Sequence, residues 1–113
     1  MAQAAFDVSQ SEMMHLPSLI DLVAGATVSK PLIETQQIKQ VLFAMDAGQR
    51  LSEHSSSYPA TVHVLDGQMM MTVGKVKHTI KVNDWLILPA NALHGIDATH
   101  PVKFLLTLVK QSS

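Results

Sequence analysis

The segment GQRLSEHSSSYPATVHVLDG, from Gly48 to Gly67, decides the fold. It opens on a turn glycine, reaches a histidine at His54, crosses a polar Ser-Ser-Ser-Tyr-Pro loop and enters an alternating strand. The Asp-Gly pair at its end is typical of a tight hairpin turn. A second segment, NDWLILPANALHGIDA at 83–98, also contains a strand, a loop and a histidine, His94. We expect both histidines to face one cavity inside a β-barrel.

The rest of the chain supplies short strands with turn signals between them. The expected strands are 27–35, 38–45, 60–65, 68–73, 76–81, 85–88 and 101–110, with a hairpin at Asp66-Gly67. Many short strands without intervening helices favour a β-sandwich or β-barrel over an alternating α/β fold. Pro31 cannot donate a hydrogen bond to a neighbouring strand, so it predicts an edge position for the first strand.

The N-terminal segment has a different pattern. Pro17 suits a first helical turn and Gly25 suits a helix end, so we expect a short helix over 17–23. This helix belongs to an arm over residues 1–25, and the barrel domain covers 26–113. The strands IKQVLFAM and VKFLLTLV are apolar on both faces, so something must cover their outer side. We expect a homodimer to do so; coverage by the arm alone is the alternative.

Composition excludes several classes of protein. The 113 residues suit one domain, and 47% hydrophobic with 15% charged residues indicates a globular chain. The net charge of −1 argues against nucleic-acid and membrane partners. The absence of cysteine excludes disulfides and thiolate metal sites. With no signal-peptide pattern and no apolar run of membrane-spanning length, we expect a cytoplasmic protein.

The two histidine segments resemble the motifs of the cupin superfamily, in its small single-domain bacterial form. The first motif runs from a glycine through two histidines and a glutamate to a glycine, and the second contains glycine, proline, glycine, histidine and asparagine. The chain has residues at five of these positions: Gly48, His54, Gly67, Pro89 and His94. The resemblance covers about 28–109 and implies a double-stranded β-helix, or jelly-roll barrel, usually dimeric, with a site in the barrel mouth.

The chain departs from the family at its metal-binding positions. The resemblance implies a metal held by three histidines and a glutamate, but Ser56 and Ala60 replace one histidine and the glutamate. Two imidazoles are fewer than the three protein ligands of ordinary open metal sites. We therefore expect no tightly held cofactor; if one binds, it is a divalent metal (Fe, Mn, Ni or Zn) at the two remaining histidines. Asn83 and Asn91 replace glycines, and asparagine tolerates the left-handed backbone that glycine serves.

His63 is a weak candidate for a third metal ligand. Since Ala60 is expected to face inward, strand alternation turns Val62 and Val64 inward and His63 outward. A bulge at Pro59 would reverse this alternation, so the candidate stays open.

Three functions compete. Paired imidazoles that titrate near neutrality can hydrogen-bond a small ligand or exchange protons with it. The first hypothesis is a small-molecule-binding barrel of unassigned ligand without a tightly held metal. The second is a metal-dependent enzyme of dioxygenase or isomerase type that uses the two histidines, and the third is a structural dimerisation module. Whether the chain is an enzyme is left open. The expected ligand-binding residues are His54, His94, Ser56, Tyr58, Ala60 and Val62.

Overall fold

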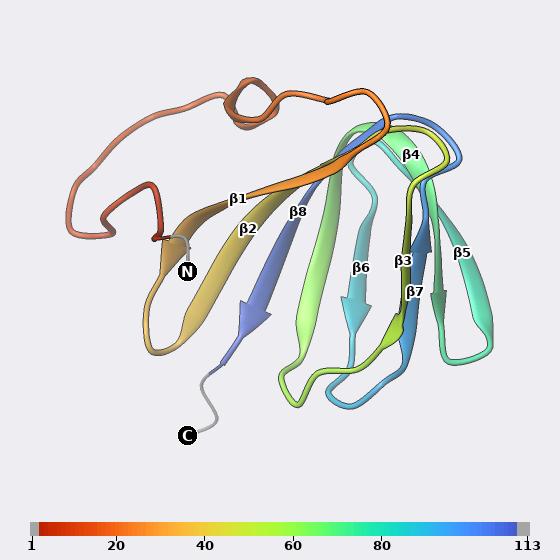
Figure 1. Ribbon diagram of the computed structural model, residues 1–113. Coiled ribbons are helices and arrows are strands. Elements are labelled where there is room, and N and C mark those ends of the chain that lie inside the picture. Colours follow the sequence, from red (N-terminus) through yellow and green to blue (C-terminus); the bar gives the residue numbers. More distant parts are fainter. Residues whose placement is uncertain (1–2, 111–113) are drawn as a thin grey trace.

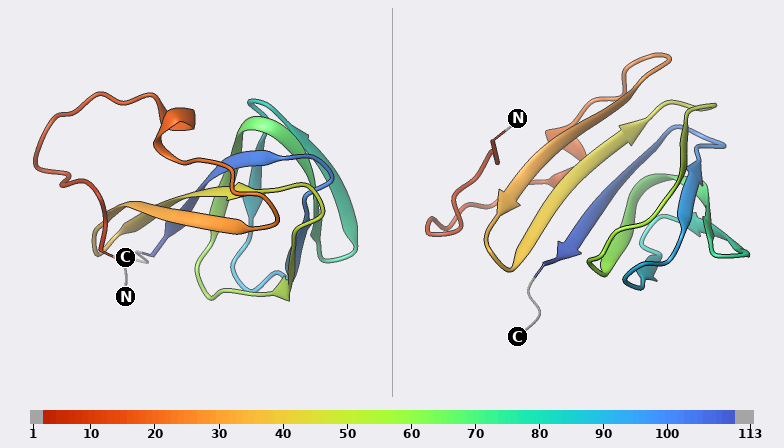
Figure 2. Two further views of the ribbon diagram at one scale, coloured as in Figure 1. Left: turned by 45° about the horizontal axis from the view of Figure 1, so that its top comes forward. Right: turned by 60° about the horizontal axis from the view of Figure 1, so that its bottom comes forward.

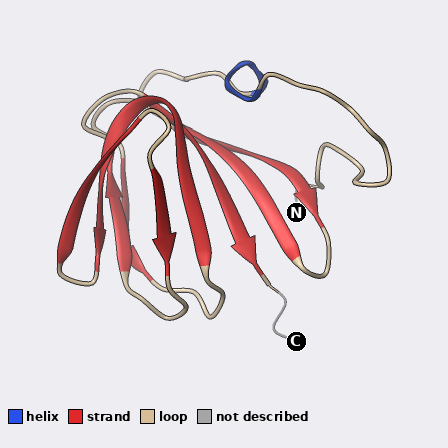
Figure 3. Cartoon of the chain, turned by 180° about the vertical axis from the view of Figure 1, so that it is seen from behind, coloured by secondary structure: helices blue, strands red, loops and turns tan. Residues whose placement is uncertain are grey.

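The computed structural model describes residues 3–110. The first two residues of the predicted arm (1–25) and the last three of the predicted barrel domain (26–113) lie outside this range. Within it the chain is all-β apart from one helical turn (Figures 1 and 3), as predicted. The elements are the 3₁₀ helix η1 (Leu16–Leu19) and the strands β1 (Thr27–Glu34), β2 (Ile38–Met45), β3 (Arg50–His54), β4 (Ala60–Val73), β5 (Val76–Lys81), β6 (Trp85–Leu88), β7 (His94–Asp97) and β8 (Val102–Val109). None of the described helical segments is long and apolar enough to cross a membrane.

Two antiparallel sheets share the long strand β4. The first sheet has the order β1-β2-β8-β4-β6 and uses the first half of β4. The second has the order β3-β7-β4-β5 and uses the second half. The strands curl into a half-barrel whose two sheets face each other (Figure 2). Pro31 lies on β1 at the edge of the first sheet, as predicted.

The hairpin predicted at Asp66-Gly67 is wrong. β4 runs through both residues as one strand and passes from the first sheet to the second, with a register shift between Val64 and Asp66. Gly67 has a φ of 76°, and a Cβ at this position would lie 1.9 Å from the carbonyl oxygen of Pro101. The corner at which β4 changes sheets requires a positive φ, and so does a tight hairpin turn. Glycine suits both.

The N-terminal helix is shorter than predicted. A 3₁₀ turn replaces the helix expected over 17–23, and Ile20 leaves it in an extended conformation (φ −142°, ψ 141°). The side chain of Ile20 is buried in a small second core, so burial against the sheet outweighs the weak local preference for helix.

The arm covers part of the outer face of the first sheet (Figure 2). The N–H groups of Ala5 and Phe6 donate to the carbonyls of Pro31 (3.0 Å) and Leu32 (2.9 Å), which extends the β1 edge. The second core lies between the arm and the sheet. Its members are Phe6, Leu16, Leu19, Ile20, Val28, Leu32, Leu42, Ala44, Leu65 and Leu105. The arm therefore covers this part of the apolar outer face, and coverage of the rest by a second copy stays a prediction.

Two lysines fasten the arm to the sheet. Lys103 Nζ donates to the carbonyl of Pro17 at 2.7 Å, and Lys30 Nζ donates to the carbonyl of Leu19 at 3.3 Å. These carbonyls belong to the helical turn, which has no continuing helix to satisfy them. Lys30 lies on β1 and Lys103 on β8, so both ammonium groups tie the arm to the sheet.

The main core fills the space between the two sheets. Its buried members are Met45, Ala60, Val62, Val64, Met69, Met71, Ile80, Leu88, Ile96, Ala98, Val102 and Phe104. Phe43 stacks on Phe104 with ring centroids 5.0 Å apart. This packing leaves a small cavity next to the two histidines of the sequence motifs.

Candidate functional site

His54 and His94 lie side by side. They end β3 and begin β7 and are directly opposed across that antiparallel pair, so their side chains leave the same face of the sheet. Their ring centroids are 4.4 Å apart with an angle of 65° between the ring planes. The register shift in β3 between Leu51 and His54 brings the histidine into this position.

Both rings line one cavity of about 60 Å³. Its other walls are apolar: Phe43, Leu51, Val62, Met71, Leu88, Ile96, Phe104 and Leu106. A space of this size holds a few water-sized groups, whereas sites that enclose a whole metabolite-sized ligand reach several hundred Å³. Only a compact ligand, or the end of a larger one, fits beside the imidazoles.

Hydrogen bonds to the main chain fix the tautomer of both rings. His54 Nδ1 lies 2.9 Å from the carbonyl oxygen of Ser52, and His94 Nδ1 lies 3.0 Å from that of Ala92. A carbonyl only accepts, so each Nδ1 carries the hydrogen and donates it. In the neutral rings each Nε2 therefore keeps its lone pair for a ligand.

The site favours a neutral His94. Burial lowers the pKa of His94 below its ordinary value of 6.5, and the charge of His54, when protonated, lowers it further. The hydrogen bond to Ala92 opposes both effects. His94 thus acts as a hydrogen-bond acceptor or a base near neutral pH.

The two loops that lead to the histidines are tied together. The N–H of Asn91 donates to the carbonyl of Ser56 at 2.7 Å, and Ser56 Oγ accepts from the N–H of Tyr58 at 3.1 Å. Asn83 and Asn91 have φ angles of 69° and 68°, so the left-handed backbone predicted for these two asparagines is confirmed.

The other predicted ligand-binding residues lie at different distances from the cavity. Val62 is fully buried and forms part of the wall. Ala60 is buried in the main core but does not line the cavity. Tyr58 is 42% exposed in the loop, and Ser56 is half-buried beside it; neither lines the cavity. Any contact between these two loop residues and a ligand would occur at the mouth.

His63 lies on the opposite face of β4 from the cavity. Val62 and Val64 on either side of it are fully buried in the core, and His63 Nε2 lies 3.3 Å from Asn83 Oδ1 on the outside. The outward direction that strand alternation predicts for His63 is confirmed. His63 therefore cannot join the other two histidines around one ion.

The donor set does not fit a metal held by three or more protein ligands. Within residues 3–110 there is no group of three His, Cys, Asp or Glu side chains placed to hold an ion. Glu53 points to the outer side of the second sheet, where its Cγ lies 3.2 Å from the position of a Cβ on Gly95. Glu34 is bonded to Lys110 at 3.0 Å, far along the chain from the histidines.

Sequence reasoning did not identify most of the apolar wall. Ile96 follows His94 by two residues, and alternate residues of a strand share a face, so this neighbour could have been found. Phe43 and Phe104 come from β2 and β8, and their position opposite the histidines depends on how the two sheets face each other. No local pattern contains that information.

The comparisons with known proteins agree with this architecture. The cupin domain family model matches residues 41–108, which is more than half of the chain. The chain therefore belongs to the cupin domain family. Among curated proteins, none matches the chain.

Solved structures share the fold over nearly the whole chain. A conserved protein of unknown function from Streptococcus pyogenes is 21% identical with a TM-score of 0.86, and the match covers 99% of this chain and 98% of that one. A cupin superfamily protein from Desulfitobacterium hafniense is 24% identical with a TM-score of 0.84 over 90% of this chain and 94% of that one. A cupin 2 conserved barrel domain protein from Leptotrichia buccalis is 31% identical with a TM-score of 0.83; the match covers 86% of this chain but 47% of that one.

Proposed function

We propose that this cupin barrel binds a small molecule through the imidazoles of His54 and His94. One observation carries the proposal: the two rings lie 4.4 Å apart on the wall of one cavity. Main-chain carbonyls hold both Nδ1 hydrogens, which leaves both Nε2 atoms as acceptors. A hydrogen bond formed among the apolar walls is stronger than one formed in water.

The ligand that suits this arrangement presents two hydrogen-bond donors on a compact end. The neutral state of His94 makes it an acceptor near neutral pH, because burial lowers its pKa. The apolar walls favour a hydrocarbon portion next to those donors. Each Nδ1 bonds to a main-chain carbonyl and not to a carboxylate. A carboxylate partner would stabilise the protonated imidazole that acid-base catalysis forms. The geometry therefore supports ligand binding more directly than catalysis.

The proposal includes no tightly held metal, because two imidazoles make an incomplete donor set. The alternative, a metal-dependent enzyme of dioxygenase or isomerase type, is favoured by the Nδ1 hydrogen bonds, since metal-bound histidines usually carry such a bond on the other ring nitrogen. Elemental analysis after incubation with Fe, Mn, Ni or Zn separates the two. Less than about a tenth of an equivalent supports the proposal, and about one equivalent that is lost in His54→Gln and His94→Gln supports the enzyme.

A ligand-detected NMR screen of fragment-sized alcohols, diols and hydroxy acids tests the binding proposal. Fragments that bind the natural chain should lose at least about tenfold in affinity in His54→Gln and His94→Gln, since each change alters an acceptor in the cavity. His100→Gln is the control, because His100 is exposed and bonds to Thr99. Binding that is the same in all four proteins would contradict the proposal. Binding of no fragment at all would favour the structural dimerisation module.

We also propose that the chain works as a homodimer. The arm covers only one part of the apolar outer face of the first sheet, and large apolar side chains elsewhere on that sheet stay exposed, among them Trp85 and Ile87. Burial of such groups stabilises association. A cytoplasmic location, suggested by the cysteine-free composition, stays a prediction.

A further inference from the structure

The outer face of the second sheet carries a groove, on the side of β3 and β7 that faces away from the two imidazoles. Its volume is about 440 Å³, which is in the range of sites that bind small molecules. The groove crosses β3, β7, β4 and β5, which lie side by side in this order (Figure 1). Its polar lining consists of Arg50, Ser52, Glu53, Thr72, Lys77 and Asp97. None of the site residues predicted from the sequence belongs to this lining.

Gly95 forms the floor of the groove. The register shift in β3 places two residues, Ser52 and Glu53, opposite the single residue Gly95, which is the arrangement of a β-bulge. A Cβ on Gly95 would lie 3.1 Å from the carbonyl oxygen of Leu51 and 3.2 Å from Cγ of Glu53. The missing side chain therefore leaves room for Glu53 to lean from β3 over β7, and Glu53 lines the groove.

Two charged groups at opposite ends of the groove have no charged partner. Glu53 lies on β3 and Lys77 lies on β5, and within residues 3–110 neither forms an ion pair. The other two charged groups of the groove neutralise each other, because Arg50 Nε lies 2.6 Å from Asp97 Oδ1. The carboxylate of Glu53 and the ammonium of Lys77 are therefore the charges that a ligand can pair with.

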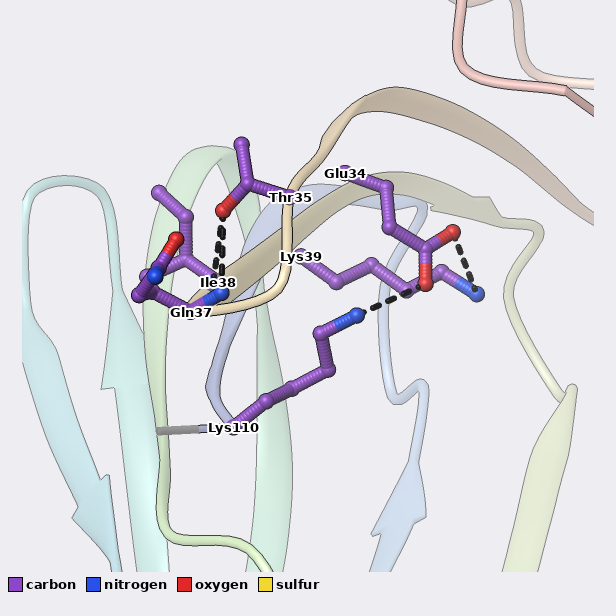
Figure 4. A network of polar contacts seen from close by, with 6 residues as sticks. All are labelled: Glu34, Thr35, Gln37, Ile38, Lys39 and Lys110. Carbon is purple, nitrogen blue, oxygen red and sulfur yellow. Dashed lines mark hydrogen bonds and ion pairs between the residues drawn. The ribbon is translucent and has the colours of Figure 1, made fainter. Parts of the chain in front are cut away.

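The first sheet shows how this chain pairs a carboxylate when cations are within reach. Lys110 Nζ donates to Glu34 Oε2 at 3.0 Å, and Lys39 Nζ lies 3.9 Å from Glu34 Oε1 (Figure 4). No lysine or arginine of the described residues takes such a position beside Glu53. A ligand cation can thus bond to Glu53 without displacing a cation of the protein.

We propose that this groove is a second ligand site, and that it takes a short linear zwitterion such as a tripeptide with free ends. The ammonium of the ligand bonds to Glu53, and its carboxylate bonds to Lys77. The groove has two positive and two negative side chains, so its charges sum to zero. Since the unpaired charges lie at opposite ends, the groove is complementary to a dipolar molecule. Thr72, on β4 between the two ends, has a hydroxyl that both donates and accepts, which suits a peptide group.

The distance between the two ends sets the length of the ligand. Glu53 leans over β7, and β7 lies two strand spacings, about 10 Å, from β5, which carries Lys77. An extended tripeptide is about 10 Å long, whereas the two charges of a single amino acid are too close together to reach both side chains. Because exposed ion pairs contribute little, we expect a dissociation constant of about 1 mM for a ligand of this size.

An amide ¹⁵N NMR titration of the full chain with triglycine, up to about 20 mM, tests the proposal well above the expected Kd. The amide signals of Thr72, Lys77 and Gly95 should shift. Glu53→Gln and Lys77→Gln should each raise the Kd at least about threefold, and both side chains are exposed, so the fold should survive. Lys75→Gln is the matched control, because Lys75 is an exposed lysine in the turn before β5, outside the groove. It should bind triglycine like the natural chain.

Peptides with one blocked end provide a second readout. N-acetyltriglycine lacks the ammonium and triglycine amide lacks the carboxylate, so each should bind at least about threefold more weakly than triglycine, as should free glycine. Groove amides that do not shift at the top of the range would overturn the proposal. Equal binding of the blocked peptides, or a loss in Lys75→Gln as large as in Lys77→Gln, would overturn it too. These results leave the imidazole site untested and unaffected, because that site lies on the other face of β3 and β7.

Discussion

Replacing Gly67 with alanine tests the corner at which β4 changes sheets. Gly67 has a φ of 76°, and an alanine in the left-handed region costs about 1 kcal/mol. The added Cβ would lie 1.9 Å from the carbonyl oxygen of Pro101 and 3.1 Å from Cα of Val102. Both contacts are with backbone, so β8 must move away at its first residue, where it pairs with Gly67. Overpacking of this kind costs about 2 kcal/mol more.

Gly67→Ala should therefore lose about 3 kcal/mol of unfolding free energy, which corresponds to a fall of about 15 °C in Tm for a chain of this length. Urea and thermal unfolding followed by circular dichroism measure it. Gly74→Ala is the control, because Gly74 has a φ of 61° but nothing within 4 Å of its added Cβ. It should lose only the strain of about 1 kcal/mol. Equal losses in the two variants would refute the close approach of β4 and β8 and would restore an ordinary hairpin at Asp66-Gly67.

Two further predictions concern the histidine site and the arm. Because burial lowers the pKa of His94 in the folded state, the unfolded chain takes up its proton first as the pH falls below 6.5. Stability should therefore drop between pH 7 and pH 5, and His94→Gln should reduce that drop in urea titrations; an unchanged slope would argue against the buried neutral ring. Ile20→Ala should lose about 2–3 kcal/mol, because Ile20 is 7% exposed between arm and sheet, while Leu22→Ala, at 40% exposed, should stay within about 0.5 kcal/mol. Similar losses from both would mean that the arm is not packed on the sheet.

The features that sequence predicted correctly depend on local rules. Alternation along one strand turned His63 outward and Val62 inward, and the backbone preference of asparagine accounted for the positive φ angles of Asn83 and Asn91. The edge position of Pro31 follows from its missing N–H group. Each conclusion needed only the chemistry of a residue and its nearest neighbours along the chain.

The features that sequence missed depend on partners far along the chain. The short strands β3 and β7 have little alternation of their own, and β3 is mostly exposed, so their pairing with each other defines them. The corner at Gly67 depends on Pro101, and Asp-Gly alone cannot separate a corner from a hairpin. The covering of this part of the outer face depends on how the arm folds back, which brings Ile20 into one buried cluster with Leu42.

The candidate site was predictable in its histidines and not in its walls. His54 and His94 stood out because each lies beside a polar loop next to a strand, at a position of the two motifs. The carbonyls of Ser52 and Ala92, each two residues before its histidine, accept the Nδ1 hydrogen and so fix the tautomer. These hydrogen bonds form only where the chain curves locally. The cavity volume depends on side chains from six strands, so only the folded chain shows how little space is left beside the rings.

Histidine-selective ¹⁵N NMR, with NOE measurements between imidazole protons, tests the shared imidazole pocket most directly. Rings with centroids 4.4 Å apart should give a cross-peak between His54 and His94, and both rings should carry their hydrogen on Nδ1 when neutral. Absence of the cross-peak in a folded sample, or hydrogens on Nε2 in both rings, would contradict the account.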